Sequence, residues 1–420
     1  MSRDPLGDRP VVGTLPRPAR GGSRTGARWA PGSGRRAGPR WQQVDLGLFI
    51  GALGLSVVGV VLVWSATRAS SGGSAALKQL VALAVGIACA AVVARLDVRS
   101  VRALAPVVYV LAVLGLAAVV SPLGSTVNGS RSWLRLPGGM TLQPSELMKV
   151  ALAVGLAMLL AERAERGLRQ RHRDVVLAWV VAGIPVLLVL AQPDLGSALV
   201  LVAMSVVIIA AAGAPWLWTV AVLVAGAGAV AAAFLTPLLS GYQRNRLRAF
   251  LDPSLDPQGI GYQTRQVRVA IGSGGLGGQG LFEGRQTQGG FIPFQETDFV
   301  FSVAGEELGF LGAAGLVVLI GFIVVRCVVV ARRADAFGRL VAIGVAVWLG
   351  VQAFENVGMN LGLMPVTGLP LPFVSSGGSS LIASWVAVGL VGNVAAASVR
   401  RRGPTGPAGV RAGGQVRPTR

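Results

Sequence analysis

Long apolar runs separated by polar segments dominate the sequence from residue 44 to residue 399. An α-helix needs about 20 residues to cross a hydrocarbon core about 30 Å thick, and most of the runs reach that length. The runs cover residues 44–66, 75–95, 101–120, 144–161, 175–192, 195–213, 215–235, 300–331, 338–359 and 377–399. They predict an all-α polytopic membrane protein with about ten transmembrane helices. Because the eighth run is too long for one simple span, we expect it to be tilted or broken near Glu306–Gly309.

The polar segments between the runs predict how the chain is oriented in the membrane. If the N-terminus is cytoplasmic, three inside segments are rich in arginine and two short outside segments contain no lysine or arginine, as the positive-inside rule requires. The inside segments are residues 95–102, 162–174 and 326–339, and the outside segments are residues 192–194 and 360–375. An even number of spans returns the C-terminus to the cytoplasm. Two larger segments then face outward: residues 121–143, and a large extracellular loop at about 237–299 between the seventh and eighth helices.

Composition supports the membrane class and weakens the others. The chain is 53% hydrophobic and 13% charged, with a mean hydropathy of +0.64, so a soluble multidomain protein is the weaker alternative. The net charge of +20 is concentrated in short loops and in the ends, residues 1–43 and 400–420. These ends cannot bury apolar surface, so we expect disordered cytoplasmic tails around one membrane domain at 44–399. Basic tails beside a membrane indicate contact with anionic lipid rather than nucleic acid.

The available residues disfavour several familiar kinds of site. The single histidine, His172, lies among arginines in a predicted cytoplasmic loop, so a general base must be a carboxylate. The two cysteines, Cys89 and Cys327, lie in apolar stretches and give no zinc or disulfide spacing. Residues 272–277 match the dinucleotide pattern G-x-G-x-x-G, but no βαβ unit surrounds them. We expect this segment to be a mobile glycine-rich loop, or a place where the backbone closely approaches substrate.

Ionisable residues inside the apolar runs carry more information, because charge in hydrocarbon is costly and usually functional. Glu146 and Lys149 are three residues apart, which would pair them on one face of a helix. The other polar residues of this kind, in the eighth and ninth runs, are Glu306, Glu307, Glu355 and Asn356. Either a structural polar network or a hydrophilic cavity for a charged ligand explains them. Asp194 has a simpler expected role, as the N-cap of the helix that follows it.

The point where the large loop re-enters the membrane is the most suggestive segment. Asp298 stands there, where one carboxylate would meet both a lipid anchor in the bilayer and its polar headgroup outside. A local alternative is that Asp298 caps the eighth helix. Arginines in the two outer segments favour an anionic partner, because a guanidinium matches phosphate, or they pair with acidic residues of the loop itself. Both interpretations are open from the residues alone.

Several motifs follow one another in a fixed order along the membrane region. They are Asn128-Gly129-Ser130-Arg131-Ser132-Trp133, Leu142-Gln143-Pro144-Ser145-Glu146-Leu147-Met148-Lys149, Gln192-Pro193-Asp194-Leu195-Gly196, Tyr242-Gln243-Arg244-Asn245-Arg246, Gly261-Tyr262-Gln263, Thr297-Asp298-Phe299, Gly362-Leu363-Met364-Pro365-Val366-Thr367-Gly368 and Ser375–Ser380. Together they resemble the SEDS glycosyltransferases, which include RodA and FtsW, over about Val44 to Arg400. Residues 256–262 and 284–288 look more like the RodA branch. The chain departs from the family pattern at Phe294, where an acidic residue is expected, and at Ser376, where tyrosine is common.

The resemblance implies a peptidoglycan glycosyltransferase that polymerises lipid II for cell-wall elongation and cell shape. Asp298 matches the family's essential acidic residue and would act as the general base. Arg244, Arg246 and Lys149 would stabilise the leaving undecaprenyl pyrophosphate. The other residues that we assign to substrate binding are Arg131, Gln143, Ser145, Glu146 and Ser379. A divalent cation, Mg²⁺ or Mn²⁺, would share the phosphate charge, but no multi-carboxylate metal motif is visible and the metal is left open.

The resemblance also implies partners and a place in the cell. The expected partners are a class B penicillin-binding protein that crosslinks the strands, the elongation machinery and membrane lipid, with no nucleic acid. The protein would lie in the bacterial plasma membrane, with both termini cytoplasmic and the active site on the outer face. Three rivals stay open: an FtsW-like septal polymerase, a lipid II flippase or other transporter, and a non-catalytic scaffold for the crosslinking enzyme. A polymerase needs Asp298 beside the membrane, whereas a transporter does not.

Overall fold

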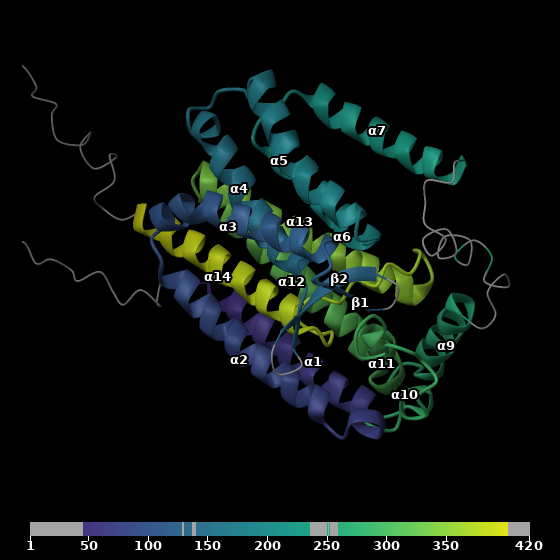
Figure 1. Cartoon of the computed structure of the whole chain (residues 1–420). Coiled ribbons are helices and arrows are strands. Elements are labelled where there is room, and N and C mark those ends of the chain that lie inside the picture. Colours follow the sequence, from purple (N-terminus) through teal and green to yellow (C-terminus); the bar gives the residue numbers. More distant parts are fainter. Residues whose placement is uncertain are drawn as a thin grey trace, which may run out of the picture. The chain divides into compact units, whose positions relative to one another are not determined.

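Figure 1 shows the computed structural model, in which long helices pack side by side. The structure describes residues 45–127, 130–136, 140–235, 250, 252 and 259–401. Both basic tails and most of residues 236–258 lie outside the described part. What the sequence predicts for those segments stays a prediction.

Each apolar run of the sequence forms helix in the structure. The corresponding helices are α1 (Leu46–Ser71), α2 (Ser74–Arg95), α3 (Val98–Val120), α4 (Pro144–Glu165), α5 (His172–Leu190), α6 (Leu195–Ala211), α7 (Trp216–Leu235), α11 (Val300–Glu307), α12 (Gly309–Arg333), α13 (Ala336–Leu361) and α14 (Gly378–Arg401). Of the described helices, eight are long and apolar enough to cross a membrane, and the apolar stretches of α6 and α7 are shorter. The helical polytopic class is confirmed, while the count of ten spans stays untested. Helices α9 (Ile260–Ser273) and α10 (Arg285–Gln288) belong to the predicted large loop.

A small sheet occupies the first large outer segment, and the pattern of apolar runs did not predict it. Strands β1 (Gly124–Val127), β2 (Ser130–Leu136) and β3 (Met140–Leu142) pair antiparallel in the order β1-β2-β3. In this register Ser125 lies opposite Trp133, and Leu134 lies opposite Leu142. Strands this short leave no signal on the scale of a membrane helix.

The predicted break in the eighth run is confirmed. Helix α11 ends at Glu307 and α12 begins at Gly309. The glycine-rich segment after α9 supplies the hydrogen bonds that a break leaves unmade, because the Gly280 N–H donates to the Glu307 carbonyl at 3.1 Å. In return, the Phe310 N–H donates to the Gly275 carbonyl at 2.9 Å. At the break, the backbone of the glycine-rich segment and the backbone of α11 and α12 therefore satisfy each other's hydrogen-bonding groups.

We call residues 274–280 the glycine joint, because its glycines allow two backbones to touch. A Cβ atom on Gly274 would lie 1.9 Å from the Gly305 carbonyl oxygen, and one on Gly278 would lie 2.1 Å from the Glu307 carbonyl oxygen. Gly278 also has a φ of +85°, which other residues rarely adopt. The expectation of a mobile loop is therefore wrong, because the backbone of this segment packs against α11 and the start of α12. A close approach of this segment to substrate stays a prediction.

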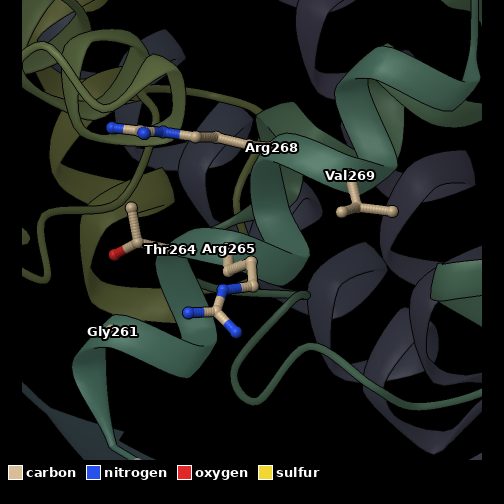
Figure 2. Close-up of a pocket in the computed structure, with 5 residues that line it drawn as sticks. All are labelled: Gly261, Thr264, Arg265, Arg268 and Val269. Carbon is tan, nitrogen blue, oxygen red and sulfur yellow. The ribbon is translucent and has the colours of Figure 1, made fainter. Parts of the chain in front are cut away.

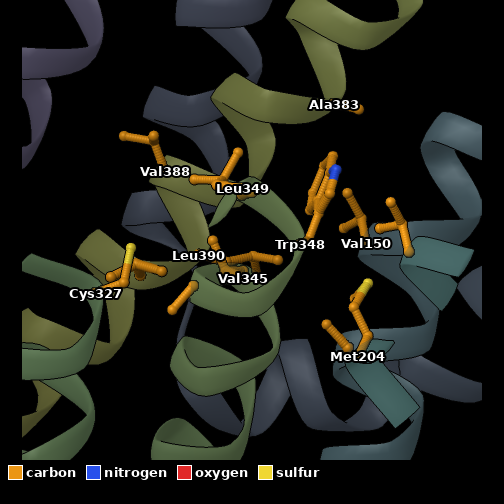
Figure 3. Packing of buried hydrophobic residues seen from close by; sticks show 14 of the residues in the cluster. Val150, Met204, Cys327, Val345, Trp348, Leu349, Ala383, Val388 and Leu390 are labelled. Atoms are coloured by element: carbon orange, nitrogen blue, oxygen red, sulfur yellow. The ribbon is translucent and has the colours of Figure 1, made fainter. Parts of the chain in front are cut away.

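Helices α4, α14 and α13 are the most enclosed of the eight candidate spans in the described part. In one apolar window of each helix, 83% of α4, 78% of α14 and 67% of α13 is buried, against 17% of α3. Figure 3 shows Trp348 of α13 beside Val150 of α4 and Met204 of α6, with Cys327 and Leu390 on the far side of α13. Polar side chains on α4 and α13 are therefore shielded from the surroundings, and this position matters for the site.

The sheet, residues 289–299 and residues 362–377 are joined at one end of the helices, which we call the loop end. Ser376 N–H donates to the Glu296 carbonyl at 2.8 Å. Ser379, at the start of α14, donates from its hydroxyl to the Thr141 carbonyl of β3 at 3.2 Å. Segments far apart in sequence thus form one connected surface.

The opposite end, which we call the basic end, carries the arginines predicted to face the cytoplasm. They are Arg95, Arg99, Arg102, Arg163, Arg166, Arg169, Arg171, Arg173, Arg332, Arg333 and Arg339. Arg326 Nε donates to Asp45 Oδ1 at 3.2 Å, which ties α12 to the start of α1. The buried amide of Gln170 donates to the Leu160 and Ala212 carbonyls, both at 3.0 Å, and holds the α4–α5 connection.

Candidate functional site

A buried ion pair lies in the first two turns of α4. Lys149 Nζ is 2.5 Å from Glu146 Oε1, and both side chains are 0% exposed. The i, i+3 spacing predicted this pair, and the structure confirms it. Gln352 Oε1 of α13 accepts from Lys149 Nζ and from Trp348 Nε1, each at 2.7 Å. Paired and hydrogen-bonded in this way, an ammonium can be kept inside a packed protein.

Asp298 is half-buried and lies just before α11. The N-cap of α11 is Phe299, so the alternative in which Asp298 is the cap residue is wrong. The carbonyl of Asp298 accepts hydrogen bonds from Asn356 Nδ2 at 2.9 Å and from Asn360 Nδ2 at 3.2 Å. Its N–H donates to the Phe294 carbonyl at 3.1 Å. The main chain of residue 298 is therefore fixed from both sides.

Helix α13 connects the buried pair with Asp298. Gln352, Asn356 and Asn360 recur every four residues, so they share one face of the helix, and each is 0% exposed. The first contacts Lys149, and the other two contact the carbonyl of Asp298. From the sequence we singled out only Asn356. An amide at every fourth position of an apolar helix is the signal that would have identified the other two.

The loop after α13, residues 362–377, uses the same amides. Gln352 Nε2 donates to the Pro370 carbonyl at 2.8 Å, and Asn356 Nδ2 donates to the Leu369 carbonyl at 2.7 Å. This loop has no regular secondary structure, so its backbone groups need partners from elsewhere. Side chains of α13 provide them, and the loop is held in place over the buried pair.

Gln143 and Ser379, two of the predicted substrate-binding residues, lie next to each other. The Gln143 N–H donates to Ser379 Oγ at 3.1 Å, and this bond fastens the end of β3 to the start of α14. Ser145, a third predicted binding residue, is fully buried in the first turn of α4. The structure brings these residues to the loop end, and their contact with substrate stays a prediction.

Several buried polar atoms near the ion pair have no hydrogen-bond partner among the described residues. They are Ser145 Oγ, Glu146 Oε2, Ser197 Oγ and both carboxylate oxygens of Glu355. They belong to α4, α6 and α13, which pack against one another. An unsatisfied buried oxygen is costly, so this region suits water or the polar groups of a ligand. For this group both interpretations of the ionisable residues, a polar network and a hydrophilic cavity for a charged ligand, stay open.

The predicted pyrophosphate-binding arginines occupy different parts of the chain. Arg131 lies on β2, and its Nε donates to the Gly124 carbonyl at 3.0 Å, so it ties β2 to β1. Arg244 and Arg246 lie outside the described residues. The role of all three in binding phosphate stays a prediction.

Glu306 and Glu307 are buried and have separate structural partners. Glu306 accepts from the N–H groups of Gln286 at 2.7 Å and Thr287 at 2.9 Å, which fixes the start of α10. Glu307 accepts from Ser65 Oγ at 2.5 Å and so joins α11 to α1. For these two residues the structural network is the better interpretation.

The acidic residues of the described part do not form a dedicated metal centre. Asp194 is the N-cap of α6, as predicted, and its Oδ1 accepts from the Ser197 N–H at 2.9 Å. Within residues 45–401, apart from the undescribed gaps, no group of three or more His, Cys, Asp or Glu side chains could hold a metal ion. The described donors do not fit such a dedicated centre, and the divalent cation that would share the phosphate charge stays a prediction through which we derive no step.

Comparisons with known proteins agree with one another. A family model described as "Cell cycle protein", which groups FtsW, RodA and SpoVE, matches residues 44–400. A Trichlorobacter lovleyi protein named "Probable peptidoglycan glycosyltransferase FtsW" is 38% identical over 367 residues, 85% of this chain and 94% of that protein. "Peptidoglycan glycosyltransferase MrdB" of Escherichia coli is 35% identical over 366 residues, 84% of this chain and 94% of that protein. A solved structure described as "Structural coordination of polymerization and crosslinking by a peptidoglycan synthase complex" matches with a TM-score of 0.71 and 36% identity, over 84% of this chain and 98% of that chain.

Proposed function

The chain belongs to the FtsW, RodA and SpoVE family of peptidoglycan glycosyltransferases, and we propose that it polymerises lipid II into glycan strands for cell-wall elongation. It is a multi-pass membrane enzyme. The elongation role rests on the RodA-like sequence of residues 256–262 and 284–288. A septal, FtsW-like role is the second candidate, favoured by the name of the relative that is 38% identical.

In the proposed reaction, the 4-hydroxyl of the acceptor's GlcNAc attacks the anomeric carbon of the donor's MurNAc. A C–O bond forms on one face of that carbon while the bond to the pyrophosphate oxygen breaks on the other, so the configuration inverts. The hydroxyl proton passes to the Asp298 carboxylate, and undecaprenyl pyrophosphate leaves with the electron pair. An ordinary aspartate is ionised at neutral pH, so it is able to accept that proton.

The observation that carries this proposal is the pair of hydrogen bonds from Asn356 and Asn360 to the carbonyl of Asp298. A general base must be held within hydrogen-bond reach of the hydroxyl it deprotonates. A displacement of about 1 Å can lower the rate by about 10²-fold. Two fully buried amides on the enclosed helix α13 supply such positioning, while Asp298 itself stays partly accessible.

For the leaving pyrophosphate we assign Arg244 and Arg246 first, because a guanidinium binds phosphate oxygens through two parallel hydrogen bonds. Lys149 and Arg131 are further candidates. Lys149 is already engaged by Glu146, so part of its charge is neutralised before a ligand arrives. The polar groups at the start of α4 and α14 then contact the sugars and the peptide. These are Gln143, Ser145, Glu146 and Ser379.

The expected partner is a class B penicillin-binding protein that crosslinks the new strands. A matching solved structure is described as a peptidoglycan synthase complex in which polymerization and crosslinking are coordinated. The elongation machinery and membrane lipid complete the proposed partners. We orient the basic end and both termini toward the cytoplasm, because arginine-rich short loops stay on that side. The loop end with Asp298 then faces outward.

Purified full-length protein supplied with lipid II, with and without a class B penicillin-binding protein, tests the proposal through the glycan polymer formed. Asp298→Asn keeps the side chain's shape and removes its basicity, so polymerisation should fall by about 10²- to 10⁴-fold. Glu296→Gln makes the same chemical change two residues earlier and should polymerise at the wild-type rate. An Asp298→Asn protein as active as wild type would overturn the catalytic assignment. Passage of lipid II across sealed liposomes without polymer would favour a transporter.

A fluorescent fusion distinguishes the two cellular roles. We expect the fusion to lie along the side wall of growing cells, where elongation takes place. A signal confined to the septum would assign the FtsW-like role instead and would leave the proposed chemistry unchanged.

A further inference from the structure

A second candidate binding site lies on α9 at the loop end. A pocket of about 290 Å³ is lined by Gly261, Thr264, Arg265, Arg268 and Val269. These residues follow helical spacing, so two turns of α9 form its wall. Figure 2 shows the two arginine side chains with Thr264 between their guanidinium groups in this view.

Among the described residues, the pocket wall carries two positive charges and no acidic residue. Arg268 Nη2 donates to the Gly362 carbonyl at 3.3 Å, and this bond directs the guanidinium toward the end of α13. Arg265 is exposed, and its guanidinium has no hydrogen-bond or ion-pair partner among the described residues. Two guanidinium groups with unused N–H donors beside one pocket match the oxygens of a phosphate.

The pocket and Asp298 adjoin different faces of α9. One face of the helix buries Val267 and Ala270 in an apolar cluster with Phe299 and Met359. Phe299 follows Asp298 directly in the chain. The face of α9 that carries Val267 and Ala270 is therefore the one that packs next to Asp298, the proposed base. The pocket residues lie on another face of the helix. A ligand bound there would not displace the acceptor from Asp298.

Apolar side chains surround the charged part of the pocket. Val269, in its wall, is 47% exposed. Leu361 and Leu363, which flank the residue contacted by Arg268, are 42% and 72% exposed. Cationic side chains surrounded by exposed apolar ones are typical of a membrane interface. A phosphate attached to an apolar chain uses both features, whereas a free phosphate uses only the arginines.

We propose that this pocket binds the phosphate of a lipid, held by Arg265 and Arg268, at a site apart from the reacting centre. Two lipids carry this chemistry: an anionic phospholipid such as phosphatidylglycerol, and a prenyl phosphate of the kind that anchors the substrate. Placing the lipid in the outer leaflet rests on the orientation proposed above. The binding chemistry rests on the pocket alone.

Native mass spectrometry of the full-length protein released from nanodiscs tests this proposal by the lipid that stays bound. Separate phosphatidylcholine nanodiscs contain phosphatidylglycerol, undecaprenyl phosphate or added inorganic phosphate. The double variant Arg265→Gln, Arg268→Gln should retain about tenfold less of the anionic lipid, because it loses two charge-assisted contacts. The matched control Arg332→Gln, Arg333→Gln removes two exposed arginines from the basic end and should behave as wild type.

The outcomes separate the lipid sources. Loss of both lipids in the α9 variant supports a general phosphate site, and loss of one alone assigns the pocket to that lipid. Equal retention by wild type and the α9 variant would overturn the proposal, and so would equal losses in the two double variants. If inorganic phosphate bound as tightly as the lipids, the proposed contribution of the exposed apolar residues Val269, Leu361 and Leu363 to binding would be overturned.

A third variant distinguishes loss of the lipid contacts from loss of the folded structure. Arg265→Lys, Arg268→Lys keeps both charges without the guanidinium geometry, so it should retain an intermediate amount of lipid. Melting temperatures equal to wild type establish that each variant is folded. Because retention is read without turnover, failure of this proposal leaves the assignment of Asp298 untouched, and the reverse also holds.

Discussion

The loop end and the basic end share one kind of interaction and differ in another. At the loop end, buried amides of the helices donate to loop carbonyls, as Asn356 does to Asp298. The basic end has such amides at Gln170 and Asn393 and adds exposed ion pairs such as Arg166–Glu162. An exposed pair contributes about 0–1 kcal/mol, whereas an unpaired buried polar group costs about 1–3 kcal/mol. Buried amides therefore fix positions at both ends, and substitutions of a buried polar group and of an exposed ion pair should differ in size.

Breaking the buried ion pair should have the largest effect. Lys149→Met leaves the Glu146 carboxylate buried without its cation, which typically destabilises a protein by about 3–5 kcal/mol. The melting temperature in a fixed detergent should fall sharply. Adding Glu146→Gln removes the second charge and should recover much of the loss. A single variant as stable as wild type would show that the buried pair within α4 and its hydrogen bond to Gln352 of α13 contribute little to stability.

Removing the amide that contacts Asp298 should come next. Asn356→Ala removes the amide donor of the Leu369 carbonyl and leaves the Asp298 carbonyl with Asn360 alone, so it should destabilise the protein by about 1–3 kcal/mol. It should also lower kcat for lipid II polymerisation by about tenfold while KM changes little, because the base is displaced.

Asn393→Ala is the matched control for this variant. Asn393 Nδ2 also donates to two carbonyls, those of Val93 and Leu96 at the α2–α3 connection. It should cost similar stability and leave kcat per folded molecule unchanged. Equal losses of kcat in both variants would mean that Asn356 acts only through general stability.

The exposed pair at the basic end should give the smallest effect. The Arg166 and Glu162 side chains are 67% and 68% exposed, so Arg166→Ala should change the free energy of unfolding by about 0.5 kcal/mol or less. The difference should shrink further in high salt. A loss comparable with that of Asn356→Ala would remove the contrast between buried amides and exposed ion pairs.

Features that depend on neighbouring residues were predictable from the sequence. The helices follow from apolar runs, the Glu146–Lys149 pair from i, i+3 spacing, and the Asp194 cap from its place before a helix. The break at Glu306–Gly309 followed from length alone, because the run exceeds what one span needs.

Features that depend on distant partners were not predictable in this way. The Asn356–Asp298 bond joins residues 58 positions apart, and no local pattern specifies which carbonyl an amide will reach. The glycine joint was misread for the same reason: a run of glycines shows that the backbone is unhindered, without showing what packs against it. The motifs that resemble a known family placed Asp298 in the site, although composition and periodicity left its role open.

Because Asn356 and Asn360 contact the main-chain oxygen of residue 298, their support does not depend on which side chain that residue carries. Residue 298 can therefore be exchanged for asparagine, cysteine or a photoreactive amino acid while its attachment to α13 stays the same. On the proposed role of Asp298, an inert protein of this kind would load donor and acceptor without consuming them. It would be suited to trapping the complete substrate complex for imaging. It would also serve to find inhibitors that compete with lipid II for a site that still binds substrate but does not catalyse the reaction.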